Sequence, residues 1–262
     1  MKKYIRAAVK DILDESWSVQ YHLADNPATN PQILARLAQS EADDIRIAVS
    51  HNPSTPEETL LKLAKDPSFS VKARITDRRS IPDSVLLTLL DDEDTRILRW
   101  VLSALMPDDD NPPRVIPSTD VYMKLATHED REIRCDIARS AAYIDLPLEV
   151  QKILARDEDR LVRRDVVLYR ENIPAEIVDM LKDDPDSSVR YAIARDVDGP
   201  REYYEHFAKD PDEGVRKAVI FNPKTPLDII EQLTYDHDEE IRKRAEDKLY
   251  LREHAKSRGF DS

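Results

Sequence analysis

The 262-residue chain carries 53 acidic residues against 40 lysines and arginines, a formal net charge of −13. This balance disfavours nonspecific attraction to nucleic acid or to an anionic membrane, although it does not exclude a local basic groove. Three glycines and a single cysteine exclude a phosphate-cradling glycine loop and an internal disulfide, and no apolar run is long enough to span a bilayer. Seventeen prolines and 35% charged residues favour helices separated by proline turns.

The first predicted element is an amphipathic helix at the N-terminus. Ile5, Val9, Ile12 and Leu13 lie at helical spacing with charged residues between them, a pattern unlike the apolar core of a signal peptide. We therefore expect a capping helix over about residues 1–15 and a cytoplasmic protein.

A repeat begins after this helix and continues to about residue 249. Its anchor is an aliphatic residue followed four places later by another, with a base directly after the first in most copies. Successive anchors lie 26, 26, 26, 36, 29, 27, 26 and 26 residues apart. The first residues of these anchors are Val19, Ile45, Val71, Ile97, Ile133, Val162, Val189, Val215 and Ile241. Gln20 and Leu98 take the place of the base in two copies.

Each repeat is predicted to be a pair of helices, called here helix A and helix B. A proline opens an apolar stripe with three- and four-residue spacing, as at Pro56 with Leu60 and Leu63, and proline suits the first turn of a helix. Helix B carries the anchor. Between the two helices lie paired aspartates, of which the second can cap helix B: Asp92 and Asp94, Asp157 and Asp159, Asp184 and Asp186, Asp210 and Asp212, Asp236 and Asp238.

The spacing grows by ten residues between the anchors at Ile97 and Ile133. The segment 106–118 holds four prolines and predicts a protruding loop, either a recognition loop or a tolerated insertion. The last predicted helix, about 240–256, is charged nearly all round and suits a solvent-facing cap.

The segments "NPSTPEETLLKLAKDPSFSVK" from Asn52 and "NPKTPLDIIEQLTYDHDEEIR" from Asn222 resemble the repeat unit of the variant leucine-rich repeat family, and the architecture is similar to HEAT-like repeats. The resemblance implies an all-α fold, a single solenoid domain over 1–262 in which about nine two-helix repeats of roughly 26 residues form a right-handed superhelix. An N-terminal cysteine cluster for iron–sulfur, present in some of that family, has no counterpart in this chain.

The resemblance also implies a ladder of charge pairs that joins adjacent repeats. An aspartate precedes the anchor base by six residues in most copies, and this regular pattern favours a structural ladder over a metal site, whose ligands must converge on one point. The predicted ladder residues are Asp66, Lys72, Asp157, Arg163, Asp184, Arg190, Asp210, Arg216, Asp236 and Arg242.

Departures from the repeat indicate where a partner binds. Leu98 replaces a base, His128 replaces an aspartate, and Trp100 lies between charged and apolar residues of its helix. The predicted partner-binding residues are Arg78, Arg79, Arg96, Arg99 and Trp100, with Asp108, Asp109, Asp110 and Arg114 of the loop.

These patterns predict a non-catalytic scaffold that binds a protein on its concave face and central loop, with no cofactor and no metal. The acidic balance predicts a partner with a basic patch and binding that weakens as salt rises. Two alternatives stay open. The arginines near Trp100 are compatible with a HEAT-like DNA-binding protein or alkylpurine DNA glycosylase, and some HEAT-like phycobilin lyases act as accessory subunits on a client protein.

Overall fold

The computed structural model describes residues 12–106, 115–168, 170 and 172–257, and all regular secondary structure there is helical. The helices come in successive A and B pairs that pack on one another, so the predicted all-α class with stacked helix pairs is confirmed. The chain divides into two compact units, Met1–Leu125 and Ala126–Ser262, here called unit 1 and unit 2.

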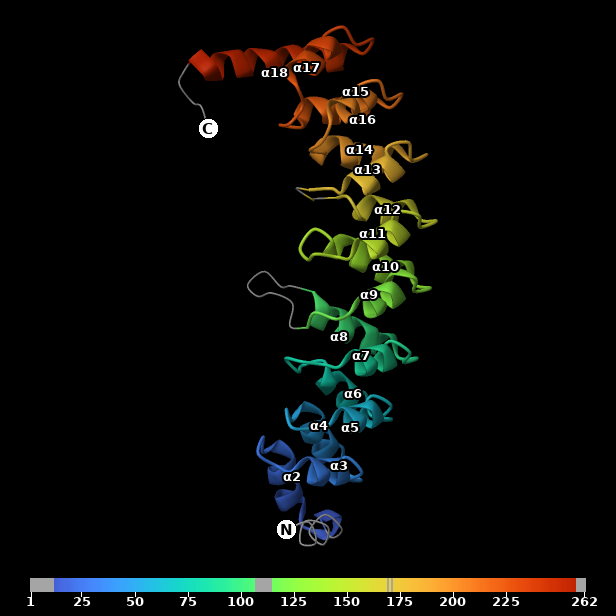
Figure 1. Cartoon of the computed structure of the whole chain (residues 1–262), viewed down its shortest axis with the longest axis vertical. Coiled ribbons are helices and arrows are strands. Elements are labelled where there is room, and N and C mark those ends of the chain that lie inside the picture. The colour runs from blue at the N-terminus through green and yellow to red at the C-terminus, as the bar shows by residue number, and fades with distance from the viewer. Residues whose placement is uncertain (1–11, 107–114, 169, 171, 258–262) are drawn as a thin grey trace. The chain divides into compact units, whose positions relative to one another are not determined.

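The described part of unit 1 begins with a short 3₁₀ helix, η1 (Ile12–Asp14), followed by alternating B and A helices (Figure 1). Its B helices are α2 (Trp17–Asp25), α4 (Asp43–His51), α6 (Phe69–Ile75) and α8 (Thr95–Leu105). Its A helices are α3 (Pro31–Leu37), α5 (Glu57–Leu63), α7 (Asp83–Leu89) and α9 (Thr119–Ala126). Helix α4 packs on α2 and on α6, and α6 packs on α8, so the B helices form a row.

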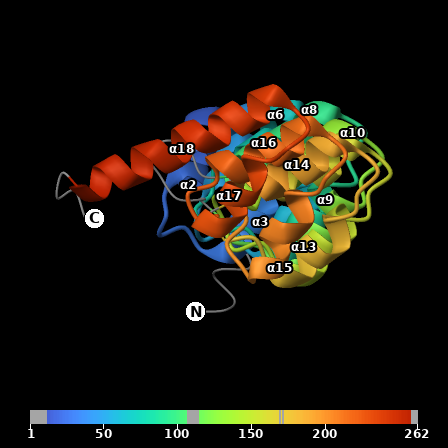
Figure 2. The ribbon, with the colours of Figure 1, turned by 90° about the horizontal axis from the view of Figure 1, so that it is seen from above.

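Unit 2 has the same alternation. Its B helices are α10 (Arg131–Ser140), α12 (Arg160–Asp165), α14 (Ser187–Asp196), α16 (Glu213–Phe221) and α18 (Glu239–Ser257). Its A helices are α11 (Leu148–Leu154), α13 (Ala175–Leu181), α15 (Arg201–Phe207) and α17 (Leu227–Leu233). Each B helix of unit 2 packs on the next, and α18 extends well past α16 and α17 (Figure 2).

Local sequence signals set where the helices begin. Proline is the N-cap residue of α5, α7, α11, α13, α15 and α17, and Pro31 is the first residue of α3. The predicted aspartate caps are confirmed: the side chains of Asp94, Asp159, Asp186, Asp212 and Asp238 accept backbone N–H groups at the start of their B helices. These bonds satisfy donors that a helix start otherwise leaves unpaired.

The core of each unit consists of the apolar stripes of both helix types. The anchors from Ile45 to Ile241 are at most 6% exposed, whereas Val19 of the first repeat is 41% exposed. Burying one such side chain stabilises the fold by roughly 2 kcal/mol. The stack thus depends mainly on contacts between neighbouring repeats.

Two predicted segments lie partly outside the described residues. Of the expected N-terminal helix, only Ile12–Asp14 is described, as a 3₁₀ helix. Of the insertion, residues 107–114 lie outside; after it, Val115 N–H donates to the carbonyl of Ala104 at 3.1 Å. The last helix, α18, has 19 residues and is charged along its length, while the other described helices have 11 or fewer, so none of them meets the requirements of a bilayer span.

Candidate functional site

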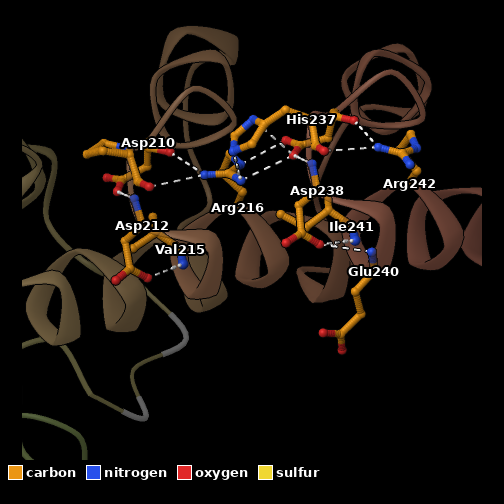
Figure 3. A network of polar contacts seen from close by, with 11 residues as sticks. Asp210, Asp212, Val215, Arg216, His237, Asp238, Glu240, Ile241 and Arg242 are labelled. Atoms are coloured by element: carbon orange, nitrogen blue, oxygen red, sulfur yellow. Dashed lines mark hydrogen bonds and ion pairs between the residues drawn. The ribbon is translucent and has the colours of Figure 1, made fainter.

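Arg216 of unit 2 shows how the charge ladder is built (Figure 3). Its Nη1 donates to the backbone carbonyl of Asp210 in its own repeat at 2.8 Å. Its Nε and Nη2 donate to the two carboxylate oxygens of Asp236 in the next repeat, at 2.8 and 3.1 Å. One edge of the guanidinium is therefore held by the backbone, and the other edge binds a carboxylate bidentately.

The same geometry recurs in four successive pairs of unit 2. The Nε–Oδ2 distances are 2.6 to 2.8 Å for Arg134 with Asp157, Arg163 with Asp184, Arg190 with Asp210, and Arg216 with Asp236. The aspartates are 3 to 8% exposed at the side chain, and each also accepts the N–H of the residue two places on. A single aspartate thus shapes its own turn and binds the preceding repeat.

The ladder carboxylate of each arginine is not the aspartate six residues before it. That aspartate offers only its backbone carbonyl, and the ion pair reaches 20 to 23 residues onward. In unit 1, Asp66 accepts from Arg46 and Lys72 donates to Asp92 at 2.5 Å. The sequence pattern therefore missed Arg46, Asp92 and Arg134 as ladder residues. Pairing each base with the aspartate 20 to 23 residues after it would have found them.

In two of the described repeats, an uncharged residue replaces the base of the ladder. In the first repeat, Gln20 replaces the base and Ser40 replaces the acid, and the Ser40 hydroxyl donates to Gln20 Oε1 at 3.3 Å. Leu98 is buried in α8, where an apolar side chain cannot form the pair. His128 replaces an aspartate before α10, and its Nδ1 accepts the N–H of Asp130 at 3.0 Å in place of a carboxylate oxygen.

A second contact between repeats involves the residue that follows helix B. The Asn52 side chain donates to the carbonyls of Ala24 and Asn26, and Asn222 does the same with Ala194 and Val197. At the equivalent position, Arg78 donates to the carbonyls of Ser50 and Asn52 at 3.1 and 2.6 Å.

The prediction that Arg78 binds a partner is therefore wrong. Arg78 is only 9% exposed, and burial lowers the pKa of its guanidinium. Its Nη1 and Nε donate to backbone carbonyls of unit 1, so it has a structural role there.

The other described members of the predicted partner surface are exposed on unit 1. Trp100 of α8 is 42% exposed, and Arg99 beside it and Arg79 after α6 form no ion pair with any described residue. Arg96 lies over the Phe69 ring at 4.3 Å and binds Asp94 at 2.7 Å. We call Arg96, Arg99 and Trp100 of α8 the α8 surface. Asp108, Asp109, Asp110 and Arg114 lie outside the described residues.

Groups with metal-binding or nucleophilic chemistry are sparse in the described part of the chain. No cluster of three or more His, Cys, Asp or Glu side chains there could hold a metal ion. The Cys135 thiol is 3% exposed, and burial raises its pKa to about 11, so it is protonated at neutral pH. A hollow of about 510 Å³ in unit 2 is lined by Arg170, Arg195, Asp196 and Lys224 among others.

Comparison with known proteins agrees with the repeat. The sequence model of the leucine-rich repeat variant family matches residues 43–68, which run from α4 through α5 to the turn before α6. No curated protein matches the chain. Among solved structures, one described as a leucine-rich repeat variant with a novel repetitive structural motif is 23% identical with a TM-score of 0.47, covering 82% of this chain and 79% of its own. An engineered protein is 18% identical with a TM-score of 0.25, covering 92% and 95%. The predicted resemblance is thus confirmed over residues 43–68, which are similar to the repeat unit of the leucine-rich repeat variant family.

Proposed function

We propose that the protein is a non-catalytic interaction scaffold and that the α8 surface contacts its protein partner. The observation that supports this role is the exposed Trp100 next to Arg99, which forms no ion pair with any described residue, on a row of helices joined by ladder contacts. Tryptophan and arginine dominate binding energy at protein interfaces, and a rigid platform loses little entropy on binding.

The charge of the molecule bears on the chemistry of the partner. Exposed carboxylates line the turns between A and B helices, among them Asp91 and Asp183, each with a side chain 72% exposed, and Glu41, Glu93 and Glu158. The proposed partner therefore has a basic patch that faces these turns, and a cytoplasmic location is part of the same proposal. Affinity should fall as ionic strength rises, because exposed charges are screened.

Affinity capture from native lysate tests the proposal, with the wild-type chain compared with Trp100→Ala and Arg99→Ala. Truncating Trp100 should reduce recovery of the bound protein by about tenfold or more. Tyr143→Ala is the matched control, because Tyr143 is 73% exposed on unit 2 and lies outside the α8 surface. Equal recovery by all variants would assign binding to another face.

Nuclease treatment of the same lysate separates the nucleic-acid alternative. A protein that stays bound after treatment supports the scaffold. Recovery that disappears with nuclease, together with loss of binding in Trp100→Ala, would favour a nucleic-acid binder that stacks a base on Trp100.

A further inference from the structure

Arg242 of α18 has the backbone contacts of the other ladder arginines. Its Nη1 donates to the carbonyl of Asp236 at 2.8 Å and to that of His237 at 3.1 Å. Arg216 makes the equivalent contacts to Asp210 and Pro211, at 2.8 and 3.3 Å. The orientation of the Arg242 guanidinium is therefore set in the same way.

Arg242 differs from the other ladder arginines of unit 2 at the opposite edge of its guanidinium, which carries Nε and Nη2. In the four ladder pairs of unit 2, Nε and Nη2 bind the next aspartate, but no described residue accepts from these two atoms of Arg242. In Figure 3, dashed lines reach Arg242 only from the backbone carbonyls, whereas Arg216 is contacted on both sides. The chain thus presents a half-buried guanidinium with a fixed orientation and an open bidentate edge.

A second copy of this chain, stacked as a further repeat, is a poor match for the same end. Ala218 and Ile220 of α16 are buried within the stack, at 0 and 1% exposed. The corresponding residues of α18 are Arg244 and Glu246, which are exposed. Covering them with another repeat would remove water from two charged groups at considerable cost.

We propose that the Nε–Nη2 edge of Arg242 is a binding site for an aspartate or glutamate carboxylate of a protein partner. The four other ladder arginines of unit 2 show that this fork binds a carboxylate bidentately when one is supplied. Phosphate has the same fork geometry, but Asp238, Glu239 and Glu246 lie within four residues of Arg242 along the chain, and their negative charge repels a dianion more than a single carboxylate. This inference does not depend on the α8 surface and can fail or hold separately from it.

The test uses NMR of the arginine Nε–H groups in the full chain, with Arg242→Gln to assign the Arg242 signal. The probe is the blocked tetrapeptide acetyl-Asp-Pro-Asp-Glu-amide, which reproduces the turn at Asp210–Glu213. The Arg242 signal should shift saturably with a dissociation constant on the order of 1 mM, and acetate or inorganic phosphate should bind more weakly.

Two variants control the experiment. Arg242→Gln breaks no ion pair among the described residues but loses the hydrogen bonds to the carbonyls of Asp236 and His237, so its urea midpoint should fall only slightly. It should abolish the peptide-induced shifts. Arg252→Gln, which alters another arginine of α18 that donates to the Pro223 carbonyl, should leave them unchanged.

Four results would overturn the proposal. The first is the absence of any shift of the Arg242 signal at a peptide concentration of about 20 mM, 20-fold above the expected dissociation constant. The second and third are equal shifts with acetate and tighter binding of phosphate than of the peptide. The fourth is concentration-dependent self-association of the chain in sedimentation that Arg242→Gln removes. The last would assign the site to a second copy of the chain.

Discussion

The two units contain the same helix pairs but differ in their ladders. Unit 2 has four consecutive arginine–aspartate pairs, whereas unit 1 has a glutamine–serine contact, one arginine pair and one lysine pair. Apart from Val19 of the first repeat, which is 41% exposed, the anchor residues are buried in both units. A charge pair is therefore not required to stack these repeats, which agrees with the small net contribution of most buried ion pairs. Once present, however, neither partner can be removed without leaving the other uncompensated.

Removing one ladder carboxylate of unit 2 should give the largest loss in the free energy of unfolding. Asp210→Ala leaves the guanidinium of Arg190 without its carboxylate and the N–H of Asp212 without an acceptor. We expect a loss of about 3–5 kcal/mol, measured by urea unfolding with far-UV circular dichroism. A loss below about 1 kcal/mol would contradict the structural role assigned to the ladder.

Tryptophan fluorescence of the Asp210→Ala variant also tests whether the two units unfold separately. Both tryptophans, Trp17 and Trp100, belong to unit 1. If the units unfold separately, Asp210→Ala should shift the circular-dichroism transition and leave the fluorescence transition nearly unchanged. Equal shifts in both signals would show that the two units unfold together.

The neutral pair of unit 1 allows the reverse experiment. Ser40 is buried and contacts Gln20, so Ser40→Asp places a carboxylate opposite an amide, at an expected cost of about 2 kcal/mol. Adding Gln20→Arg should restore most of the lost unfolding free energy, because the double variant recreates the arginine–aspartate pair seen in unit 2. Fluorescence-detected unfolding of both single variants and the double variant measures the coupling. Additive effects would mean that the two side chains do not act as a ladder pair.

Local signals made most of the fold predictable. Proline at the start of helix A and aspartate at the start of helix B act within one turn, and their positions in the structure agree with the sequence pattern. The ladder was harder, because the partner of each base is nearly one repeat away. Arg78 was misassigned because its acceptors are backbone carbonyls of the preceding repeat, which no side-chain pattern reveals.

The lysine pair of unit 1 should respond to a smaller change. Lys72 Nζ binds one oxygen of Asp92, and Lys72→Arg could bind both oxygens and the carbonyl of Asp66 as well. We expect a gain of about 0.5–1 kcal/mol in fluorescence-detected unfolding. Arg190→Lys in unit 2 is the reciprocal change and should lose a similar amount. A destabilising Lys72→Arg would show that unit 1 lacks room for the fork.

The smallest expected difference between the units is in how much stability each loses at acid pH. Burial alone would raise the pKa of Asp236, but hydrogen bonds from Arg216 and from the Asp238 N–H outweigh it and hold that pKa below the ordinary 3.8. The pKa values of the cap residues Asp159, Asp186 and Asp238 are also lowered, by hydrogen bonds from Leu161 N–H, the Ser188 hydroxyl and Ile241 N–H respectively. In unit 1, the Arg96 side chain lowers the pKa of Asp94 to about 2.

A carboxylate whose pKa is lower in the folded state contributes stability above its unfolded pKa and loses it as the pH falls through the folded value. Unit 2 has more such groups among the described residues, so below about pH 4 it should lose more stability than unit 1. Acid titration should then show the circular-dichroism signal falling before tryptophan fluorescence changes. Asp159→Asn should bring the circular-dichroism and fluorescence transitions closer together in pH, because an amide caps the helix without titrating. A fluorescence change that comes first would mean that the carboxylates of unit 1 contribute more to its stability than their contacts indicate.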